Sequence, residues 1–254
     1  MDPNLILLVA GFFTIALIYS SVGFGGGSSY LALLGQSMFA LSQAEIKSTA
    51  LFCNIIVVIG GTIIFYREGK ISFKEFWPYL ALSVPMAYIG GFWKLQDQTF
   101  YILLGATLVM AAILLWLQPE KMDRKKNLIP EITSTKIALG GAIGFLSGLV
   151  SIGGGIFLSP VLHFFRWMDA KKISALASVF ILVNSIGGLA GQFHRGIPAL
   201  DWTFLIPVLF AVLLGGQIGS RLGAKKFNPL YIKRITAIVI LVAGLNILKD
   251  HVVI

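Results

Sequence analysis

The sequence has very little charge for its length. Only 12% of its 254 residues are Asp, Glu, Lys or Arg, whereas a soluble domain carries about 25%. So few charged side chains cannot cover a surface that water surrounds, and the mean hydropathy of +0.86 is high. Because apolar stretches recur along the whole chain, the sequence excludes a soluble domain with one anchor and predicts an integral membrane protein with many helical spans.

Residues that build metal, redox or catalytic sites are also scarce. The chain has one cysteine, Cys53, which excludes an intramolecular disulfide and a cysteine-built metal centre. Its three histidines have no mutual metal-ligand spacing, and no phosphate-binding loop or pair of carboxylates is present. An intramembrane enzyme would need such a cluster or a nucleophile with a base, so we expect no cofactor, no metal and no catalytic residue. The net charge of +9 fits basic loops beside a membrane better than nucleic-acid binding.

Ten apolar segments follow one another along the chain, which predicts an all-α polytopic fold. Segments of about 20 residues suit a helix that crosses a hydrocarbon core of about 30 Å. The first, second, sixth and seventh are shorter, and they flank two Gly-Gly-Gly triplets. The segments cover residues 5–21, 27–41, 47–66, 76–93, 99–118, 136–150, 156–168, 173–193, 202–220 and 230–248.

The two halves of the sequence resemble each other. Residues 22–34 align with residues 150–162, which superimposes the glycine triplets. Further on, Ser48 and Asn54 align with Ser178 and Asn184. Internal repeats of this kind are common in transporter folds. We therefore expect an N-terminal repeat over 1–118, a linker over 119–135 and a C-terminal repeat over 136–254, each with about five helical segments.

The basic residues predict how the repeats are oriented. Most of the 20 Lys and Arg residues lie in the loops after the third, fifth, seventh and ninth segments, and the other loops hold few, with Lys47 assigned to the loop after the second segment. Cytoplasmic loops are rich in Lys and Arg, so equivalent loops lie on opposite sides and the repeats are inverted. This predicts a cytoplasmic linker, extracytoplasmic termini and a reversal of the chain at each triplet. Whether each hairpin is re-entrant or spans the membrane fully stays open.

The glycine triplets predict a site for an anion. Broken backbone at membrane depth is tolerated only where it is buried in protein or lines a polar cavity. A glycine at a helix start leaves N–H groups unshielded, and the helix dipole there attracts anions. Inverted symmetry would bring the two helix starts together near the midplane. The candidate substrate-binding residues are Gly25, Gly26, Gly27, Ser28, Ser21, Gly153, Gly154, Gly155, Ser151, Asn54, Asn184, Ser48 and Ser178.

Helix packing is the alternative role for such residues. Glycines spaced by four residues over 140–148 and 215–223 are expected to let helices approach each other. Asn54 and Asn184 either line a cavity or tie two helices together. A lone serine can bond back to its own helix. Gln192 lies late in its segment and is a weaker candidate.

Four stretches of the sequence resemble a known family. They read GFGGGSSYLALL, GLVSIGGGIFLSPVL, GGLAG and GGQIGSRLGAKKF. With these motifs in two-repeat order over nearly the whole chain, the sequence resembles the sulfite exporter / toluene-sulfonate uptake permease family, of TauE/SafE type. The resemblance implies a secondary transporter of small sulfur-containing anions, such as sulfite, sulfonates or sulfoacetate, in a bacterial inner membrane. It also assigns both glycine triplets to the substrate site.

The expected function is transport of a small anion by alternating access, with the anion near the midplane at the two helix starts and the lipid bilayer around the protein. An anion channel with the same pore chemistry, a carrier of a different small organic anion and a membrane scaffold are the alternatives. The identity of the anion, import or export, coupling to protons or another ion, and a homodimeric state stay open.

Overall fold

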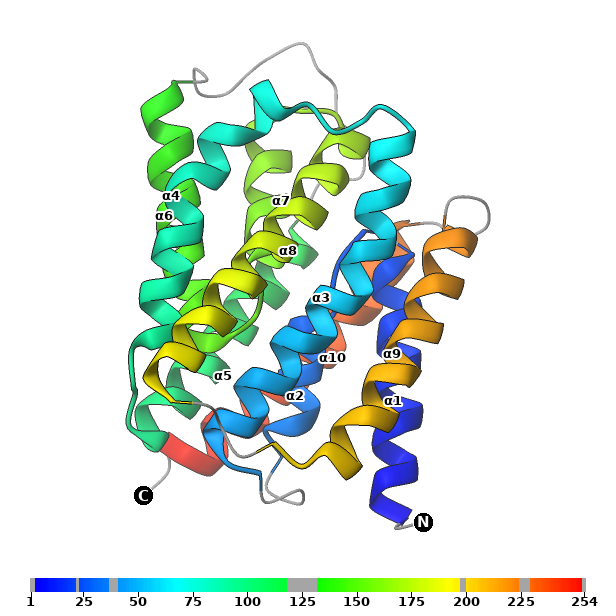
Figure 1. The fold of residues 1–254 in the computed structure, drawn as a ribbon, viewed down its shortest axis with the longest axis vertical. Helices are drawn as coiled ribbons and strands as arrows, with labels where there is room; N and C mark the ends of the chain where they lie inside the picture. The colour runs from blue at the N-terminus through cyan, green and yellow to red at the C-terminus, as the bar shows by residue number, and fades with distance from the viewer. Residues whose placement is uncertain are drawn as a thin grey trace.

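The computed structural model describes residues 3–21, 23–36, 41–117, 132–196, 200–223 and 229–252. Within these ranges the chain forms ten α-helices and no strand (Figure 1), which confirms the all-α polytopic class. Most of the linker expected at 119–135 lies outside the described residues. The helices are α1 (Pro3–Ser20), α2 (Gly27–Leu34), α3 (Gln43–Arg67), α4 (Phe73–Phe92), α5 (Asp97–Trp116), α6 (Thr133–Val150), α7 (Gly155–Phe165), α8 (Ala170–Arg195), α9 (Trp202–Gly223) and α10 (Pro229–Val252).

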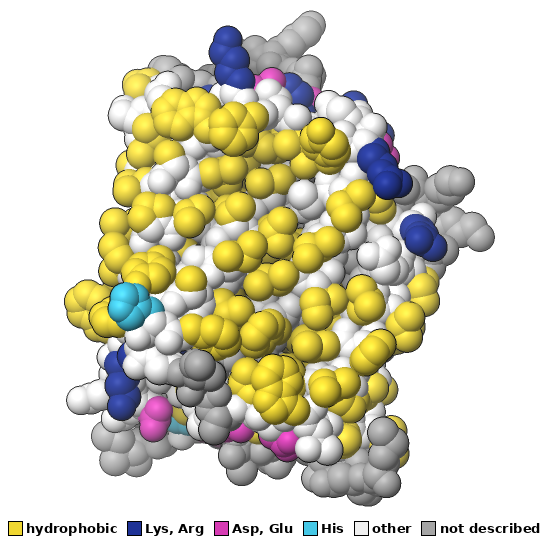
Figure 2. All heavy atoms as spheres, in the orientation of Figure 1, with side chains coloured by type: hydrophobic (Ala, Val, Ile, Leu, Met, Phe, Trp, Pro, Cys, Tyr) yellow, Lys and Arg dark blue, Asp and Glu magenta, His cyan; other side chains and the backbone are white. Residues whose placement is uncertain are grey.

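The outer surface of the bundle is apolar. Among the described residues, five helices are long and apolar enough to cross a membrane: α3, α5, α6, α8 and the Trp202–Arg221 part of α9. Figure 2 shows hydrophobic side chains over the middle of the visible face, with Lys, Arg, Asp and Glu near its upper and lower ends. Such a belt fits the hydrocarbon layer of a bilayer, and the chain is a multi-pass membrane protein.

The helices pack in pairs that recur in the two halves of the chain. When α1–α5 are matched in order with α6–α10, most contacts have a counterpart. The pair α4–α6 corresponds to α9–α1, and the pair α4–α8 corresponds to α9–α3. Likewise α2 contacts α3 as α7 contacts α8, and α10 contacts α2 as α5 contacts α7. The remaining large contacts, α3 with α8 and α5 with α10, join equivalent helices directly. This is the pairing expected when α1–α5 and α6–α10 are related by a two-fold axis.

The two predicted glycine stripes allow close backbone approach in the pairs α4–α6 and α1–α9. A Cβ at Gly140, Gly144 or Gly148 in α6 would meet carbonyl groups of α4, and a Cβ at Gly215 or Gly219 in α9 would meet carbonyl groups of α1. The packing role predicted for these stripes is confirmed, although the last glycine of the second stripe lies outside the described side chains. α4–α6 and α1–α9 therefore pack with their backbones in close approach, as α4 and α8 also do at Gly91 and Gly191.

The ends of the helices define two ends of the bundle. Both chain termini, the start of α3 and the end of α8 lie at the lower end of Figure 1, which we call the terminal end. The connections from α3 to α4 and from α7 to α8 lie at the opposite end. The α1–α2 hairpin starts and finishes toward the terminal end, whereas the α6–α7 hairpin starts and finishes toward the opposite end. The two hairpins thus enter the bundle from opposite directions.

Candidate functional site

Each of the two hairpins is interrupted at a glycine triplet. α2 begins at Gly27 and α7 begins at Gly155, and the residues before them, Gly26 and Gly154, are the N-caps. Their φ angles of 85° and 81° lie in the left-handed region that favours glycine. A glycine cap offers no side-chain acceptor to the first-turn N–H groups of the helix. Both helix starts therefore keep the backbone donors that suit an anion.

Asn54 of α3 lies where the two interruptions meet. Its side-chain nitrogen Nδ2 donates a 3.1 Å hydrogen bond to the carbonyl oxygen of Ile152 in the second interruption. A Cβ at Gly25 or Gly27 in the first interruption would lie 2.7 or 2.5 Å from the Asn54 amide group. A Cβ at Gly153 would lie 2.8 Å from Nδ2. The structure thus brings the two triplets together around one buried amide.

The first interruption is bonded to the other half of the chain in a similar way. Ser178 of α8 donates a 3.0 Å hydrogen bond from Oγ to the carbonyl oxygen of Gly23. Ser178 is buried, and Gly23 has a φ of 83°. Each interruption is therefore held by a polar side chain from a long helix of the opposite half: Asn54 holds the second and Ser178 holds the first.

A network of buried side-chain hydrogen bonds connects α3 to the second interruption. The Ser48 hydroxyl donates to Gln192 Oε1 at 2.9 Å, and Gln192 Nε2 donates to Ser151 Oγ at 3.1 Å. Ser151 is the C-cap of α6, with a φ of 63°. Gln192 is thus the link between two of the sequence-predicted residues, Ser48 and Ser151. The sequence position of Gln192, late in the eighth segment, does not predict these hydrogen bonds, because both partners come from other helices.

Asn184 is the sequence equivalent of Asn54 but has different surroundings. It is fully buried in α8, and within the described part of the chain neither its Nδ2 nor its Oδ1 has a hydrogen-bond partner. A buried polar group without a partner costs about 1–3 kcal/mol. Its neighbour Ser185 has a hydroxyl that also lacks a partner among the described residues, and this hydroxyl lies 3.3 Å from where a Cβ at Gly153 would lie. Of these two residues, Ser185 is therefore the one that borders the second interruption.

The first interruption carries more hydroxyl groups than the second. Tyr19 Oη lies 2.5 Å from Ser29 Oγ and 3.5 Å from Ser28 Oγ. The Tyr30 hydroxyl is buried, has no hydrogen-bond partner among the described residues and lies 3.1 Å from the point where a Cβ at Gly26 would be. At the start of α7 the corresponding side chains are Ile, Phe and Leu. An oxyanion between the two helix starts would therefore meet hydroxyl donors mainly from the first half.

A small cavity lies between the interruptions. Its volume is about 10 Å³, which is roughly the space that one water needs. A multi-atom oxyanion does not fit into this volume. The cavity is lined by Tyr19, Phe24, Gly25, Gly26, Gly27, Ser28, Ile152, Ile156 and Ile181.

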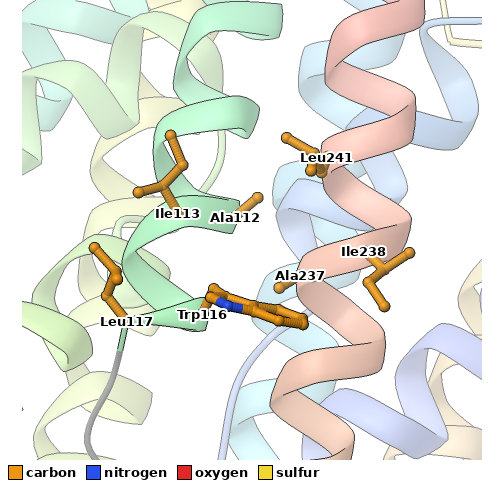
Figure 3. Close-up of a pocket in the computed structure, with 7 residues that line it drawn as sticks. All are labelled: Ala112, Ile113, Trp116, Leu117, Ala237, Ile238 and Leu241. Atoms are coloured by element: carbon orange, nitrogen blue, oxygen red, sulfur yellow. The ribbon is translucent and has the colours of Figure 1, made fainter.

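A larger cavity of about 360 Å³ lies elsewhere, between α5 and α10 (Figure 3). Apart from the Trp116 indole N–H, its lining side chains are apolar, so it offers an anion almost no donors. We therefore do not assign the substrate site to it. The lining residues are Ala112, Ile113, Trp116, Leu117, Ala237, Ile238 and Leu241.

The remaining sequence-predicted residues have simpler surroundings. Ser21 donates from Oγ to the carbonyl oxygen of Ile18 at 2.6 Å, so its hydroxyl bonds back to α1 and does not join the others. A Cβ at Gly155 would lie 2.5 Å from Ile181, which shows that α7 starts tightly against α8. The structure therefore gathers the triplets, Asn54 and the hydroxyls of the first interruption, and leaves Ser21 outside.

Lys47 corrects the sequence analysis, which assigns it to a loop. The structure places it inside α3, where it is only 1% exposed. α3 begins earlier than expected because Ser42 and Glu45 form a capping box: the Glu45 N–H donates to Ser42 Oγ and the Ser42 N–H donates to Glu45 Oε2 at 2.9 Å. The Ser-x-x-Glu signal for this start was present in the sequence. Lys47 is thus a buried cation of the bundle.

Comparison with known proteins gives one family. The sequence matches the family model described as "Sulfite exporter TauE/SafE" over residues 7–247. The "Probable membrane transporter protein y4hK" of Sinorhizobium fredii is 34% identical over 254 residues, which cover 98% of this chain and 100% of that protein. The "Probable membrane transporter protein YjnA" of Bacillus subtilis is 29% identical, with 98% and 100% covered. "Probable membrane transporter protein MJ0441" of Methanocaldococcus jannaschii is 26% identical, with 96% and 94% covered. No solved structure matches significantly.

Proposed function

The chain belongs to the sulfite exporter TauE/SafE family of membrane transporters, and from this premise we propose that it carries a small sulfur-containing anion between the two glycine interruptions. The observation that carries the proposal is the contact of Asn54 with both interruptions. One amide group next to two helix starts from opposite halves is the arrangement in which a single anion could meet both sets of backbone N–H donors.

The donors around the interruptions suit an oxyanion. Backbone N–H groups at the starts of α2 and α7 would replace part of its hydration shell, and the hydroxyls of Ser28, Ser29 and Tyr30 would add donors on one side. The amide of Asn184, unpaired among the described residues, supplies two further donor hydrogens on α8. Neutral donors of this kind bind an anion without fixing it as tightly as a buried arginine would. Release on the other side of the membrane is then possible.

The fold supports alternating access as the mechanism. The α1–α2 and α6–α7 hairpins enter from opposite ends, and the helices of the two halves form two mixed groups, α1–α9–α3 and α6–α4–α8, which meet at α3–α8. If the halves are inverted repeats, rocking one of these groups against the other would open the site to each side in turn. The distribution of Lys and Arg among the loops supports a terminal end outside the cytoplasm. The membrane we propose, from the family, is a bacterial inner membrane.

The test is uptake of labelled sulfite into proteoliposomes that contain the purified protein. Unlabelled sulfate and an alkyl sulfonate serve as competitors, and each uptake is measured with and without a pH gradient. We expect saturable flux, counterflow and inhibition by at least one competitor. Flux that does not saturate and shows no counterflow would instead identify a channel. Folded protein that moves no sulfur anion would reject the substrate class, and a wider panel of organic anions would then be needed.

A further inference from the structure

Lys47 is a buried cation for which the described residues supply no acidic partner. Its Nζ lies 5.9 Å from the centroid of the Phe100 ring, and the nearby Arg195 guanidinium acts on it as a like charge. Glu45, two residues earlier, is committed to the capping box with Ser42. A buried ammonium without a counter-charge is unfavourable. Ionisable residues inside a membrane bundle are rare and mark functional sites, among them the pathways of substrates and ions.

The helix dipole stabilises the positive charge of Arg195 but not that of Lys47. Arg195 is the last residue of α8, where the negative end of the helix dipole stabilises a cation. Lys47 lies near the start of α3, where the helix dipole is positive. Two cations and a helix start thus concentrate positive potential at one place in the terminal end of the bundle. The natural partner of such a place is an anion.

These two cations lie close in sequence to two residues of the hydrogen-bond network of Ser48, Gln192 and Ser151. Ser48 directly follows Lys47 on α3, and Gln192 lies one turn before Arg195 on α8. Hydrogen bonds lead from Ser48 to Gln192 and on to Ser151 at the second interruption. Three buried polar side chains therefore lead from the helical turns that carry the two cations to the second interruption.

We propose that Lys47 and Arg195 form an outer anion-binding station at the terminal end, which an oxyanion occupies on its way between the solvent and the glycine interruptions. This inference rests on the proposed function, since the anion is the one transported. The ammonium and guanidinium groups attract and partly desolvate the anion. The hydrogen-bond network of Ser48, Gln192 and Ser151 then provides donors toward the central site when the bundle opens.

The competing explanation is that Lys47 only packs against Phe100. Lys136 offers a matched control, since its Nζ lies 5.7 Å from the centroid of the Tyr79 ring near the start of α6. It makes the same kind of cation–ring contact at an equivalent level of a helix. Lys136 lies in the first turn of α6, at the other end of that helix from Ser151. Replacing each lysine by methionine keeps the length of the side chain and removes the charge.

The experiment compares wild type, Lys47→Met, Lys47→Arg and Lys136→Met for sulfite flux in proteoliposomes and for melting temperature in detergent. For Lys47→Met we expect KM to rise about tenfold or more, as for the loss of one hydrogen bond to a charged group. Vmax should change less. The melting temperature should stay equal or rise, because an unpaired buried charge is removed. Lys47→Arg should keep a low KM, and Lys136→Met should leave KM unchanged. An unchanged KM in Lys47→Met, or equal effects of both methionine variants on KM, would contradict the proposal that Lys47 forms an anion-binding station.

A binding measurement separates this inference from the transport proposal. If the wild-type protein carries no sulfur anion, the proposed function fails. The station is then tested by the melting temperature in sulfite, sulfate or methanesulfonate, each compared with chloride at equal ionic strength. Stabilisation of the wild type that is lost in Lys47→Met supports the station. The same stabilisation in both proteins, or none in either, rejects it.

Discussion

The side-chain amide of Asn54 donates a 3.1 Å hydrogen bond to the carbonyl oxygen of Ile152, across the boundary between the two halves of the chain. Ile152 lies in the second interruption, and no backbone N–H of the described residues donates to its carbonyl oxygen. The bond satisfies that carbonyl within the protein, which is required at membrane depth. It also fixes how close the second interruption lies to Gly25 and Gly27 of the first.

Replacing Asn54 by alanine should therefore affect both stability and transport. The Ile152 carbonyl would lose its partner, at a cost of about 1–3 kcal/mol in the free energy of unfolding. We expect a lower melting temperature in detergent and a large loss of sulfite flux in proteoliposomes. Thr107→Val is the control, because Thr107 is buried and its Oγ1 donates to the Leu104 carbonyl within its own helix. Equal flux in Asn54→Ala and wild type would show that the bond is dispensable.

Gly154→Ala should abolish transport while the protein still inserts into the membrane. The φ of 81° costs a non-glycine residue about 1–2 kcal/mol, and the new methyl group would lie 2.7 Å from Phe180 Cε1. The start of α7 would have to move away from α8. Gly69→Ala separates backbone strain from the steric clash, since Gly69 has a φ of 65° but a Cβ there would meet nothing within 4 Å. If both variants lose flux equally, backbone strain and not the position at the interruption is responsible.

Much of the fold could be predicted from the sequence because the relevant signals are local. Apolar segments and glycine triplets are read directly, and the alignment of Asn54 with Asn184 pointed to equivalent places in α3 and α8. The structure shows that these places are equivalent in the chain but not in their contacts. Asn54 has a backbone partner in the other half, whereas neither side-chain atom of Asn184 has one among the described residues. Such an asymmetry depends on the packing of side chains far apart in the sequence.

The residues that sequence analysis missed are those whose role depends on distant partners. Gln192 links Ser48 and Ser151, two residues from different halves. The apolar segments alone assign Lys47 to a loop. The capping box at Ser42 starts α3 closer to the N-terminus, so Lys47 lies inside the helix. The capping signal could have been found in the sequence. The burial of Lys47 against Phe100 could not, because α3 and α5 are separated by another helix in the chain.

Gly144→Ala should destabilise the fold without acting on the site. Its Cβ would overlap the Ser83 carbonyl group of α4, and backbone cannot yield as a flexible side chain can. We expect a lower melting temperature and lower yield of inserted protein, with the KM for sulfite unchanged in the protein that folds. Gly216→Ala is the matched control, because its Cβ would lie at an ordinary 3.5 Å from Val57. Equal melting temperatures for both variants and wild type would contradict the close packing of α4 on α6.

Asn184→Leu should lower transport, as Asn54→Ala does, but without lowering stability. Leucine has a similar size, and it replaces an amide that is buried without a hydrogen-bond partner in the described part of the chain. Removing an unsatisfied polar group costs no hydrogen bond, so the melting temperature should stay the same or rise. If Asn184 binds the anion, flux should fall strongly and stabilisation by added sulfite should decrease. A fall in melting temperature like that of Asn54→Ala would mean that Asn184 ties helices together. Unchanged flux and unchanged sulfite stabilisation would remove Asn184 from the site. Because stability and transport are expected to move in opposite directions, general misfolding cannot produce the predicted result.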